Sequence, residues 1–304
     1  MKLLVDMSSL LWQSLLAAKD KEYGYEVDFE GKPTHVNGWQ FGLECATAHL
    51  VLVMRELNIT PADVVLVVEG KMSKARRKAI YSGYKDGRGG RPAEAYVEFE
   101  KCKDAIVSLF GNLGATTVTQ QGVEGDDVIA FLANNITGEK VILSRDGDMT
   151  ALIGPETALW QNGMLTRANK YGPFSTSKTA VYKALVGDSS DNINGAPGFG
   201  QRAFLDLLVW AGEPGLAALE GMIQRRTLHE LQDDVAEFKP LRKIIEGAES
   251  VYVSYEVACM HPEWINTERN PLIVTPGRIV SEDQITDDHL RKYALPTGAA
   301  ARDV

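Results

Sequence analysis

The stretch ATTVTQQGVEGDDVIAFL (residues 115–132) passes from a strand pattern into a helix pattern and carries three carboxylates at the junction. Residues 115–119 favour a short strand, and the spacing of apolar residues from 126 onward favours a helix. Glu124, Asp126 and Asp127 lie where this helix begins. Because neighbouring carboxylates repel each other and lose hydration beside a buried segment, the arrangement is unfavourable unless cations offset it.

The same alternation of strand and helix patterns runs through the N-terminal half of the chain. Strand patterns cover 2–6, 63–70, 115–119 and 140–144, and helical patterns cover 40–57, 95–113 and the segment from 126. This order predicts an α/β fold with a mainly parallel sheet covered by helices on both faces. From about residue 175 helical patterns dominate, so we predict a core over 1–175 and a second, helical region over 176–304.

Length and composition exclude several classes of protein. A chain of 304 residues with 44% hydrophobic and 24% charged residues can bury a large core, and its apolar runs are too short to span a bilayer. Asp6 interrupts the first apolar run, which argues against a signal peptide. Cys45, Cys102 and Cys259 show no metal or redox spacing, as expected in a reducing cytoplasm.

Acidic residues follow each predicted strand at the end where it finishes. Asp6 and Glu69 end two strands, and Asp146 and Asp148 directly follow a third. The carboxyl ends of parallel strands share one edge of a sheet, where ligands bind. The predicted group of converging carboxylates is Asp6, Glu69, Glu124, Asp126, Asp127, Asp146 and Asp148, with Asp188 and Asp191 joining from the start of the helical region.

Each of these acids also has a simpler explanation when it is taken alone. Asp126, Asp127 and Asp188 could cap helices, and the Asp-x-Asp pair could form an ordinary turn. Their shared edge favours cation binding instead, because capping requires no common position. An all-oxygen ligand set favours Mg²⁺ or Mn²⁺ over zinc. A pair of such ions serves phosphoryl chemistry, so we expect two.

The net charge of −9 conceals a strongly basic segment. Residues 71–91 carry eight Lys and Arg against the single Asp86. Such a run is either a solvated face or, because it begins beside Glu69 and includes tyrosines, a lid or arch over about 70–94 that clamps a nucleic-acid strand. We expect Lys85 and Arg76 to neutralise the phosphate that is cut.

A glycine-rich stretch lies between two helical patterns in the second region. Its residues, NINGAPGFGQRAF (192–204), fit either a simple helical corner or a helix–hairpin–helix over about 188–210. In the second case the backbone near Gly198 and Gly200 would bind a phosphate without reading bases, and Arg202 would add positive charge.

Together these motifs resemble the 5′-nuclease family of flap endonucleases, polymerase 5′-nuclease domains and bacteriophage 5′→3′ exonucleases, and most resemble the bacteriophage enzymes. The resemblance covers about residues 1–210 and is carried by six segments in the family's order: VDMSSLLW, VVEG, GYKDGR, VEGDDVIAFLA, LSRDGDMTAL and LVGDSSDNINGAPGFGQRAF. It implies a Rossmann-like, PIN-type nuclease core, a helical arch, and a helix–three-turn–helix region that can hold K⁺.

The resemblance also implies roles for individual residues. One metal site would use Asp6, Glu69, Glu124, Asp126 and Asp127, and a second would use Asp146, Asp148, Asp188 and Asp191, with Asp146 and Asp188 also counted as catalytic. The DNA-binding set would be Arg77, Tyr84, Lys85, Arg88, Gly198, Gly200 and Arg202, where Lys85 and either Arg76 or Arg77 are the arch cations. Three departures stand out: Glu69 in place of Asp, Thr150 in place of Gln, and Gln201-Arg202 in place of Lys-Thr.

We therefore predict a Mg²⁺- or Mn²⁺-dependent 5′→3′ exonuclease or 5′-flap endonuclease of phage DNA replication or host DNA degradation. It would be a monomer that acts on DNA with 5′ ends, nicks or flaps, does not bind membranes, and leaves 5′-phosphate products. An RNA-directed or primer-removing nuclease of the same fold and a non-enzymatic module that binds DNA structures remain as alternatives. A glycosyltransferase would explain Asp146 and Asp148 but not the other seven acids.

Overall fold

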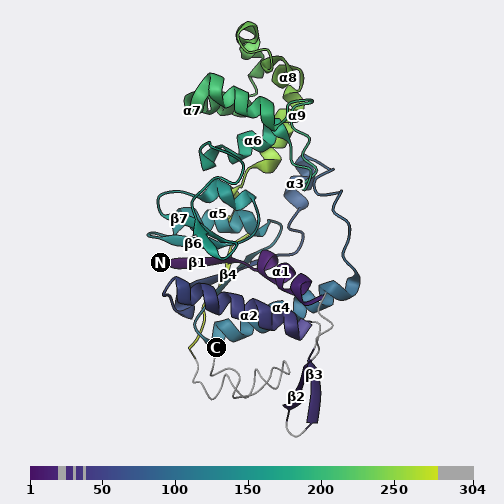
Figure 1. Cartoon of the computed structure of the whole chain (residues 1–304), viewed down its shortest axis with the longest axis vertical. Helices are drawn as coiled ribbons and strands as arrows, with labels where there is room; N and C mark the ends of the chain where they lie inside the picture. Colours follow the sequence, from purple (N-terminus) through teal and green to yellow (C-terminus); the bar gives the residue numbers. More distant parts are fainter. Residues whose placement is uncertain (20–24, 30–31, 37–38, 280–304) are drawn as a thin grey trace.

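The computed structural model describes residues 1–19, 25–29, 32–36 and 39–279. Its centre is a sheet with the strand order β8-β7-β6-β1-β4-β5-β9 (Figure 1). The strands are β1 (Lys2–Asp6), β4 (Val64–Glu69), β5 (Thr116–Gln120), β6 (Lys140–Leu143), β7 (Thr157–Gln161), β8 (Met164–Thr166) and β9 (Ile273–Thr275). The five inner strands are parallel, and the two edge strands pair antiparallel. The predicted α/β fold with a mainly parallel sheet is confirmed.

Helices cover both faces of this sheet, as the alternation of buried residues along β1 requires. Leu3 and Val5 pack against the layer of α1 (Met7–Lys19), α2 (Trp39–Glu56) and α4 (Ala93–Asn112). Leu4 points the other way and packs against α5 (Gly125–Asn135). In Figure 1 the first layer lies below the strands and α5 lies above them. The chain therefore brings the carboxyl ends of β1, β4 and β6 to one edge.

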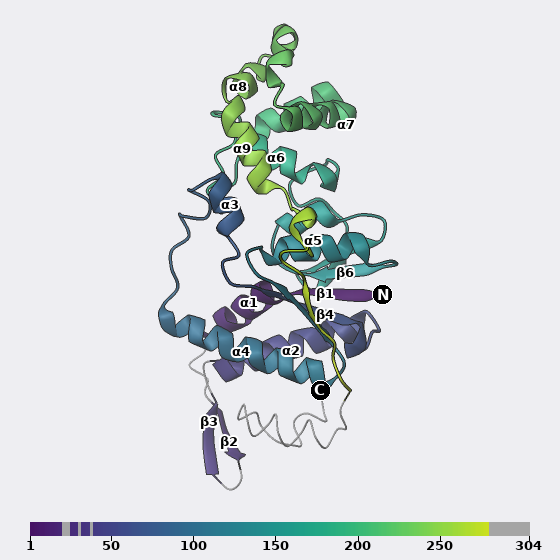
Figure 2. The ribbon, with the colours of Figure 1, turned by 180° about the vertical axis from the view of Figure 1, so that it is seen from behind.

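The basic segment leaves the end of β4 and returns to the sheet layer only at α4. It contains one short helix, α3 (Ala75–Ile80), followed by turns and an extended stretch up to residue 92. Figure 2 shows α3 beside α9 and the chain running down from it to α4. Tyr84 packs on Ile193 and Val257 of the helical region. The segment thus connects the upper and lower parts of the molecule, as expected for an arch.

The helical region has its own hydrophobic core. Its helices are α6 (Thr179–Val186), α7 (Gln201–Arg225), α8 (Leu241–Glu246) and α9 (Ala248–Ala258). Helix α7 is kinked, because Gly212 has a φ of 66° and Pro214 follows it. Short 3₁₀ helices are η1 (Pro61–Asp63), η2 (Asp148–Leu152), η3 (Thr176–Lys178), η4 (Leu228–Ala236) and η5 (Pro262–Trp264).

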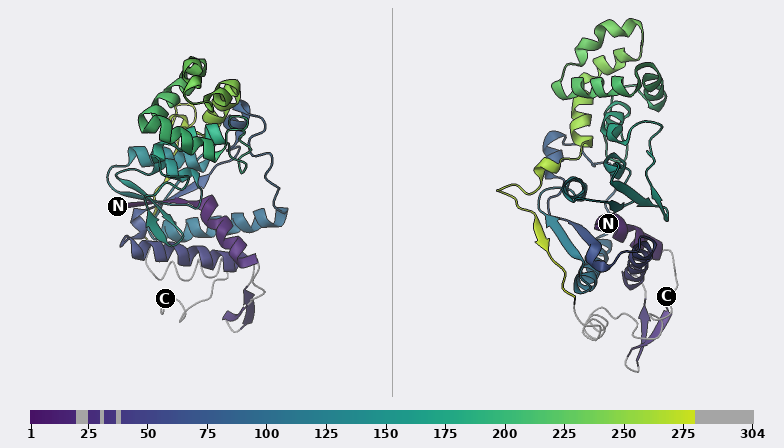
Figure 3. Two further views of the ribbon diagram at one scale, coloured as in Figure 1. Left: turned by 45° about the horizontal axis from the view of Figure 1, so that its top comes forward. Right: turned by 90° about the vertical axis from the view of Figure 1, so that its left-hand side faces the viewer.

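The chain beyond α9 returns to the core, which the helical pattern did not predict. In the right-hand view of Figure 3 this yellow segment runs down past the sheet. There β9 pairs antiparallel with β5, and Gln120 Nε2 donates to the carbonyl of Trp264. The second region predicted over 176–304 thus includes a piece of the sheet, and its residues 280–304 lie outside the described part.

The sequence analysis did not predict three further parts of the fold. They are α1, the hairpin of β2 (Tyr25–Phe29) and β3 (Lys32–Val36), and the pair β7–β8. Helix α1 begins directly after β1, and Asp6 caps it because the Ser9 N–H donates to Asp6 Oδ1; the sequence analysis took Asp6 only as the end of a strand. In the described part of the chain no helix is long and apolar enough to cross a membrane.

Candidate active site

Acidic and basic side chains share one cavity at the carboxyl ends of β1 and β4. Its volume is about 620 Å³. Five of the predicted acids line it: Asp6, Glu69, Glu124, Asp126 and Asp146. The cations that line it come from the arch and from α4, and include Lys71, Lys74, Lys85, Arg88, Arg91 and Lys103. The expected meeting of the strand ends with the basic segment is therefore present.

Asp6 ends β1 and is held by neutral donors alone. Ser144 Oγ donates to its Oδ2 over 2.7 Å, and the Ser9 N–H donates to its Oδ1 over 3.0 Å. Burial, together with the charges of Asp146 and Glu69, raises the pKa of Asp6 to about 6, although these hydrogen bonds lower it. The carboxylate is thus oriented but not neutralised.

Asp126, in the first turn of α5, lies in the same environment. Burial raises its pKa well above the ordinary value, and Asp146 and Asp6 add to this rise. Asp146 is fixed locally, because its Oδ1 accepts the Asp148 N–H over 2.9 Å. Among the described residues none forms an ion pair with Asp6, Glu69, Asp126 or Asp146. We call these four residues the unpaired acids.

The other five acids are each held by a cation of the chain. Asp127 is fully buried, and Arg77 donates to both of its oxygens over 2.7 and 2.8 Å. Arg77 also donates to Glu124 over 2.9 Å and to the carbonyls of Val257 and Cys259. Its guanidinium therefore fastens the arch to α5 and to the chain after α9. It is a structural cross-link.

Glu124 and Asp191 are contacted by two further cations of the arch, Lys85 and Arg88. Lys85 Nζ donates to Glu124 over 2.6 Å and lies 3.9 Å from Asp191, which Arg88 also contacts. Burial alone would raise the pKa of Glu124, but Lys85 and Arg77 outweigh it and lower the pKa. The hydroxyl of Tyr84 donates to Glu124 over 2.8 Å.

Asp148 and Asp188 share a buried lysine that the sequence analysis did not single out. Lys183 of α6 forms ion pairs with both, at 2.5 Å for Asp188, and its side chain is 3% exposed. Burial raises the pKa of Asp148 to about 6 against the opposing effect of Lys183. Lys183 lowers the pKa of Asp188 to about 2, although burial opposes it. The only signal in the sequence was a lysine on the apolar face of a helix.

The expected coordination shell of nine acids is therefore not assembled in this structure. Within the described residues, no three acidic, His or Cys side chains are placed to hold an ion together. The reason is physical: Arg77, Lys85, Arg88 and Lys183 lie among five of the acids and take the place of external cations. The donor chemistry of the unpaired acids suits a hard divalent ion, because all their ligand atoms are carboxylate oxygens, and binding one would draw them together from their present positions.

Three residues of the arch do not lie where the sequence analysis placed them. Arg77 and Tyr84 were expected to contact DNA, but both are buried at 4% and 3% exposure, and they bind Glu124 instead. Arg76 was expected at the scissile phosphate, but its guanidinium lies 5.3 Å from the ring centre of Trp264. In this structure none of the three lies where its expected role would place it. Lys85 and Arg88 do reach the cavity.

An aromatic group on the α1 and α4 side of this cavity was missed. The Trp12 ring stacks on Phe99 with centres 4.6 Å apart and meets Tyr96 edge-on at 5.4 Å. The guanidinium of Arg91 lies 3.9 Å from the Trp12 ring centre. All four residues line the cavity. Spacing along the sequence does not show which rings reach a cavity.

The glycine-rich stretch forms the turn between α6 and α7. Gly198 has a φ of 71°, which favours glycine, and Gly200 precedes the first turn of α7. Both glycines are exposed, and the Arg202 side chain is 88% exposed. Lys243 of α8 donates to the Gly198 carbonyl over 2.6 Å. Donors and positive charge therefore gather at this turn, and the predicted K⁺ site stays a prediction.

Comparisons with known proteins identify relatives of similar sequence. A 5′-3′ exonuclease of Halalkalibacterium halodurans is 27% identical over 278 residues, which cover 86% of this chain and 84% of that protein. DNA polymerase I of Deinococcus radiodurans is 28% identical over 235 residues, which cover 74% of this chain. The chain spans only 23% of that polymerase.

The fold also matches a solved structure. The bacteriophage T5 D15 flap endonuclease, in a complex with DNA and metal ions, has a TM-score of 0.61 at 14% identity. The match covers 96% of this chain and 99% of that one. At this identity the likeness concerns the fold.

The family follows from a match that covers more than half of the chain. Residues 1–182 match the model of the 5′-3′ exonuclease N-terminal, resolvase-like domain. This range contains the whole sheet except β9, and with it every unpaired acid. The protein therefore belongs to the 5′-3′ exonuclease family, which is a family of nucleases.

Proposed function

We propose that the protein is a divalent-metal-dependent nuclease that cuts DNA phosphodiester bonds at 5′ ends, nicks or flaps and leaves 5′-phosphates. The observation that carries the proposal is one cavity in which four unpaired acids face the cations of the arch. Carboxylates alone would repel a phosphate, and arginines alone would only bind one. Together with a metal ion they provide both binding and hydrolysis.

Asp6, Asp126 and Asp146 would hold the ion, with Glu69 as the longer ligand at the end of β4. When bound, Mg²⁺ or Mn²⁺ lowers the pKa of water and stabilises charge on the leaving oxygen. Ser144 and Ser9 orient Asp6 for this role through the hydrogen bonds described above. The T5 D15 flap endonuclease, which has the same fold, was solved with metal ions, which supports metal binding by this chain.

A second ion at Asp148, Asp188 and Asp191 requires rearrangement of cations. Lys183 would have to leave the first two carboxylates, and Arg88 would have to leave the third. Arg88 is suited to such a move, because its side chain is 47% exposed, whereas that of Lys183 is 3% exposed. We propose that an arriving DNA phosphate draws Arg88 and Lys85 away from the acids.

The DNA would be bound at two places. The exposed turn at Gly198 and Gly200, with Arg202 and Lys243, would bind backbone phosphates of the duplex. The rings of Trp12 and Tyr96 with Arg91 would stack on unpaired bases near the cavity. The DNA polymerase I relative supports a role in replication, which remains part of the proposal together with a phage origin.

Product sizing on a 5′-labelled flap duplex tests the proposal. The wild-type chain with Mg²⁺ is expected to release labelled mononucleotides if it is an exonuclease, or one longer fragment if it cuts the flap. EDTA and the Asp146→Asn variant should both abolish release. Equal cleavage by the variant would contradict the assignment, and cleavage of an RNA strand but not of DNA would favour the RNA-directed alternative.

A further inference from the structure

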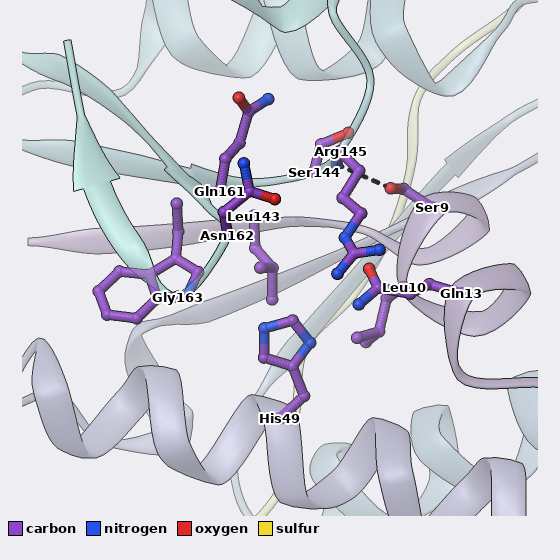
Figure 4. Close-up of a pocket in the computed structure, with 11 residues that line it drawn as sticks. Ser9, Leu10, Gln13, His49, Leu143, Ser144, Arg145, Gln161, Asn162 and Gly163 are labelled. Carbon is purple, nitrogen blue, oxygen red and sulfur yellow. Dashed lines mark hydrogen bonds between the residues drawn. The ribbon is translucent and has the colours of Figure 1, made fainter. Parts of the chain in front are cut away.

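A second pocket lies directly behind the wall that holds Asp6. Its volume is about 190 Å³, and it is formed by α1, α2, the end of β6 and the turn from β7 to β8 (Figure 4). Ser9 and Ser144, the two residues that bind Asp6, also line this pocket. One layer of side chains therefore separates it from the unpaired acids.

This pocket has a basic side chain and no acidic one, unlike the neighbouring cavity, where acids and cations are mixed. No Asp or Glu is among the residues that line it, and Arg145 has no ion pair with any described residue. Figure 4 shows its guanidinium pointing into the space between Asn162, His49 and Gln13. The Arg145 N–H donates to Ser9 Oγ over 2.9 Å, which fixes the backbone from which the guanidinium extends.

The pocket also contains a donor without a partner. Trp160 lines it and is 6% exposed, and its buried indole N–H has no acceptor among the described residues, so a ligand that shifts the neighbouring side chains would give it one. Buried polar groups nearly always have a partner, and leaving one unsatisfied costs about 1–3 kcal/mol. Burial and the charge of Arg145 lower the pKa of His49, so its neutral ring offers one further N–H. These groups together favour an acceptor-rich, anionic ligand.

We propose that this pocket binds the phosphate monoester of a 5′-nucleotide, with its oxygens on Arg145, Trp160 and the side-chain amides of Gln13 and Asn162. The proposal rests on the proposed function, because hydrolysis that leaves 5′-phosphates produces this group beside the pocket. A guanidinium fork and an N–H match the several oxygens of a phosphate. The volume admits a phosphate with part of its nucleoside but not a duplex.

Two sources can supply this phosphate. It can belong to the released mononucleotide, or to the 5′ end of the strand before the next cut. In the second case the pocket would set how far the end lies from the acids, which would favour removal of one nucleotide at a time.

Calorimetry in EDTA removes phosphate binding through metal ions at the unpaired acids, and the Arg145→Gln variant separates this pocket from the arch cations and the turn at Gly198. The probes are 2′-deoxyadenosine 5′-monophosphate, 2′-deoxyadenosine and inorganic phosphate. The monophosphate is expected to bind at least tenfold more tightly than the nucleoside. Arg145→Gln should weaken it at least tenfold and Trp160→Phe severalfold.

Arg55→Gln is the matched control, since Arg55 is exposed in the last turn of α2, near the start of β4. It should leave the affinity unchanged. Equal binding of nucleoside and monophosphate, no binding, or an equal loss in both arginine variants would overturn the proposal. Because no cleavage is measured, these results do not depend on whether the chain is a nuclease.

Cleavage rates then separate the two sources. If the pocket holds the strand end, duplexes with a 5′-phosphate are degraded at least fivefold faster than those with a 5′-hydroxyl, and Arg145→Gln removes the difference. If it holds the product, both ends are cut equally and the monophosphate inhibits the wild type more than Arg145→Gln. If the wild type shows neither a preference for a 5′-phosphate nor inhibition by the monophosphate, the proposal is contradicted.

Discussion

The unpaired acids and the five paired acids lie within the same site but differ in whether a cation of the chain lies beside them. Asp6 and Asp126 are buried among other carboxylates, and their pKa values are raised. Asp127 and Asp188 are matched by Arg77 and Lys183, and the pKa of Asp188 is lowered. The first group is suited to an external cation, whereas the second already has a cation of the chain.

This difference shows that an acid-rich motif does not identify metal ligands one by one. Asp126 and Asp127 are neighbours in sequence, but successive residues of a helix point in directions about 100° apart. One therefore lines the cavity, and the other is sealed against Arg77. The four predictions below test the contrast.

The largest expected effect separates these two neighbours. Asp126→Asn should lower the cleavage rate about 10³-fold, because it removes a charge that would hold the metal ion. It should not lower the melting temperature without metal, since it relieves repulsion. Asp127→Asn should instead lower the free energy of unfolding by about 3 kcal/mol, because Arg77 loses a buried partner. Single-turnover cleavage and calorimetric melting measure both. A stable, inactive Asp127→Asn variant would reverse the assignment.

Lys183→Met converts paired acids into unpaired ones. The variant keeps a similar length but leaves Asp148 and Asp188 without a cation, so its free energy of unfolding in EDTA should fall by about 3 kcal/mol. Mg²⁺ should then raise the melting temperature of the variant more than that of the wild type. An equal shift in both proteins would mean that Lys183 does not compete with a metal ion.

The pH dependence of stability should follow the unpaired acids. The pKa of Asp6 is raised from 3.8 to about 6, so the folded protein binds this proton more tightly than the unfolded chain does. Stability in EDTA should therefore fall as the pH rises from about 4 to 6, by about 3 kcal/mol for this group. Mg²⁺ should reverse the trend, because it stabilises the ionised form. Melting temperatures across this range measure the effect, and a rise without metal would contradict it.

The smallest effect concerns the distant turn at Gly198. Lys243→Gln should weaken duplex binding severalfold and reduce the slope of log affinity against log salt by about one, because one phosphate contact is lost. The cleavage rate at saturating DNA should not change, since Lys243 lines neither of the cavities that contain the acids. Filter binding at several salt concentrations tests this, with Arg55→Gln as the exposed arginine control.

The sequence alone determined the α/β order, the alignment of acids at the strand ends and the family, because periodicity and strand–helix junctions are local properties. It did not reveal α1, β7–β8 or the return of β9, whose pairing depends on chain segments far away in sequence. Nor could it separate Asp126 from Asp127, or find Lys183, Trp12 and Arg145. Only the tertiary structure decided which charges meet, because a side chain's partner depends on packing between distant elements and not on its neighbours in the chain.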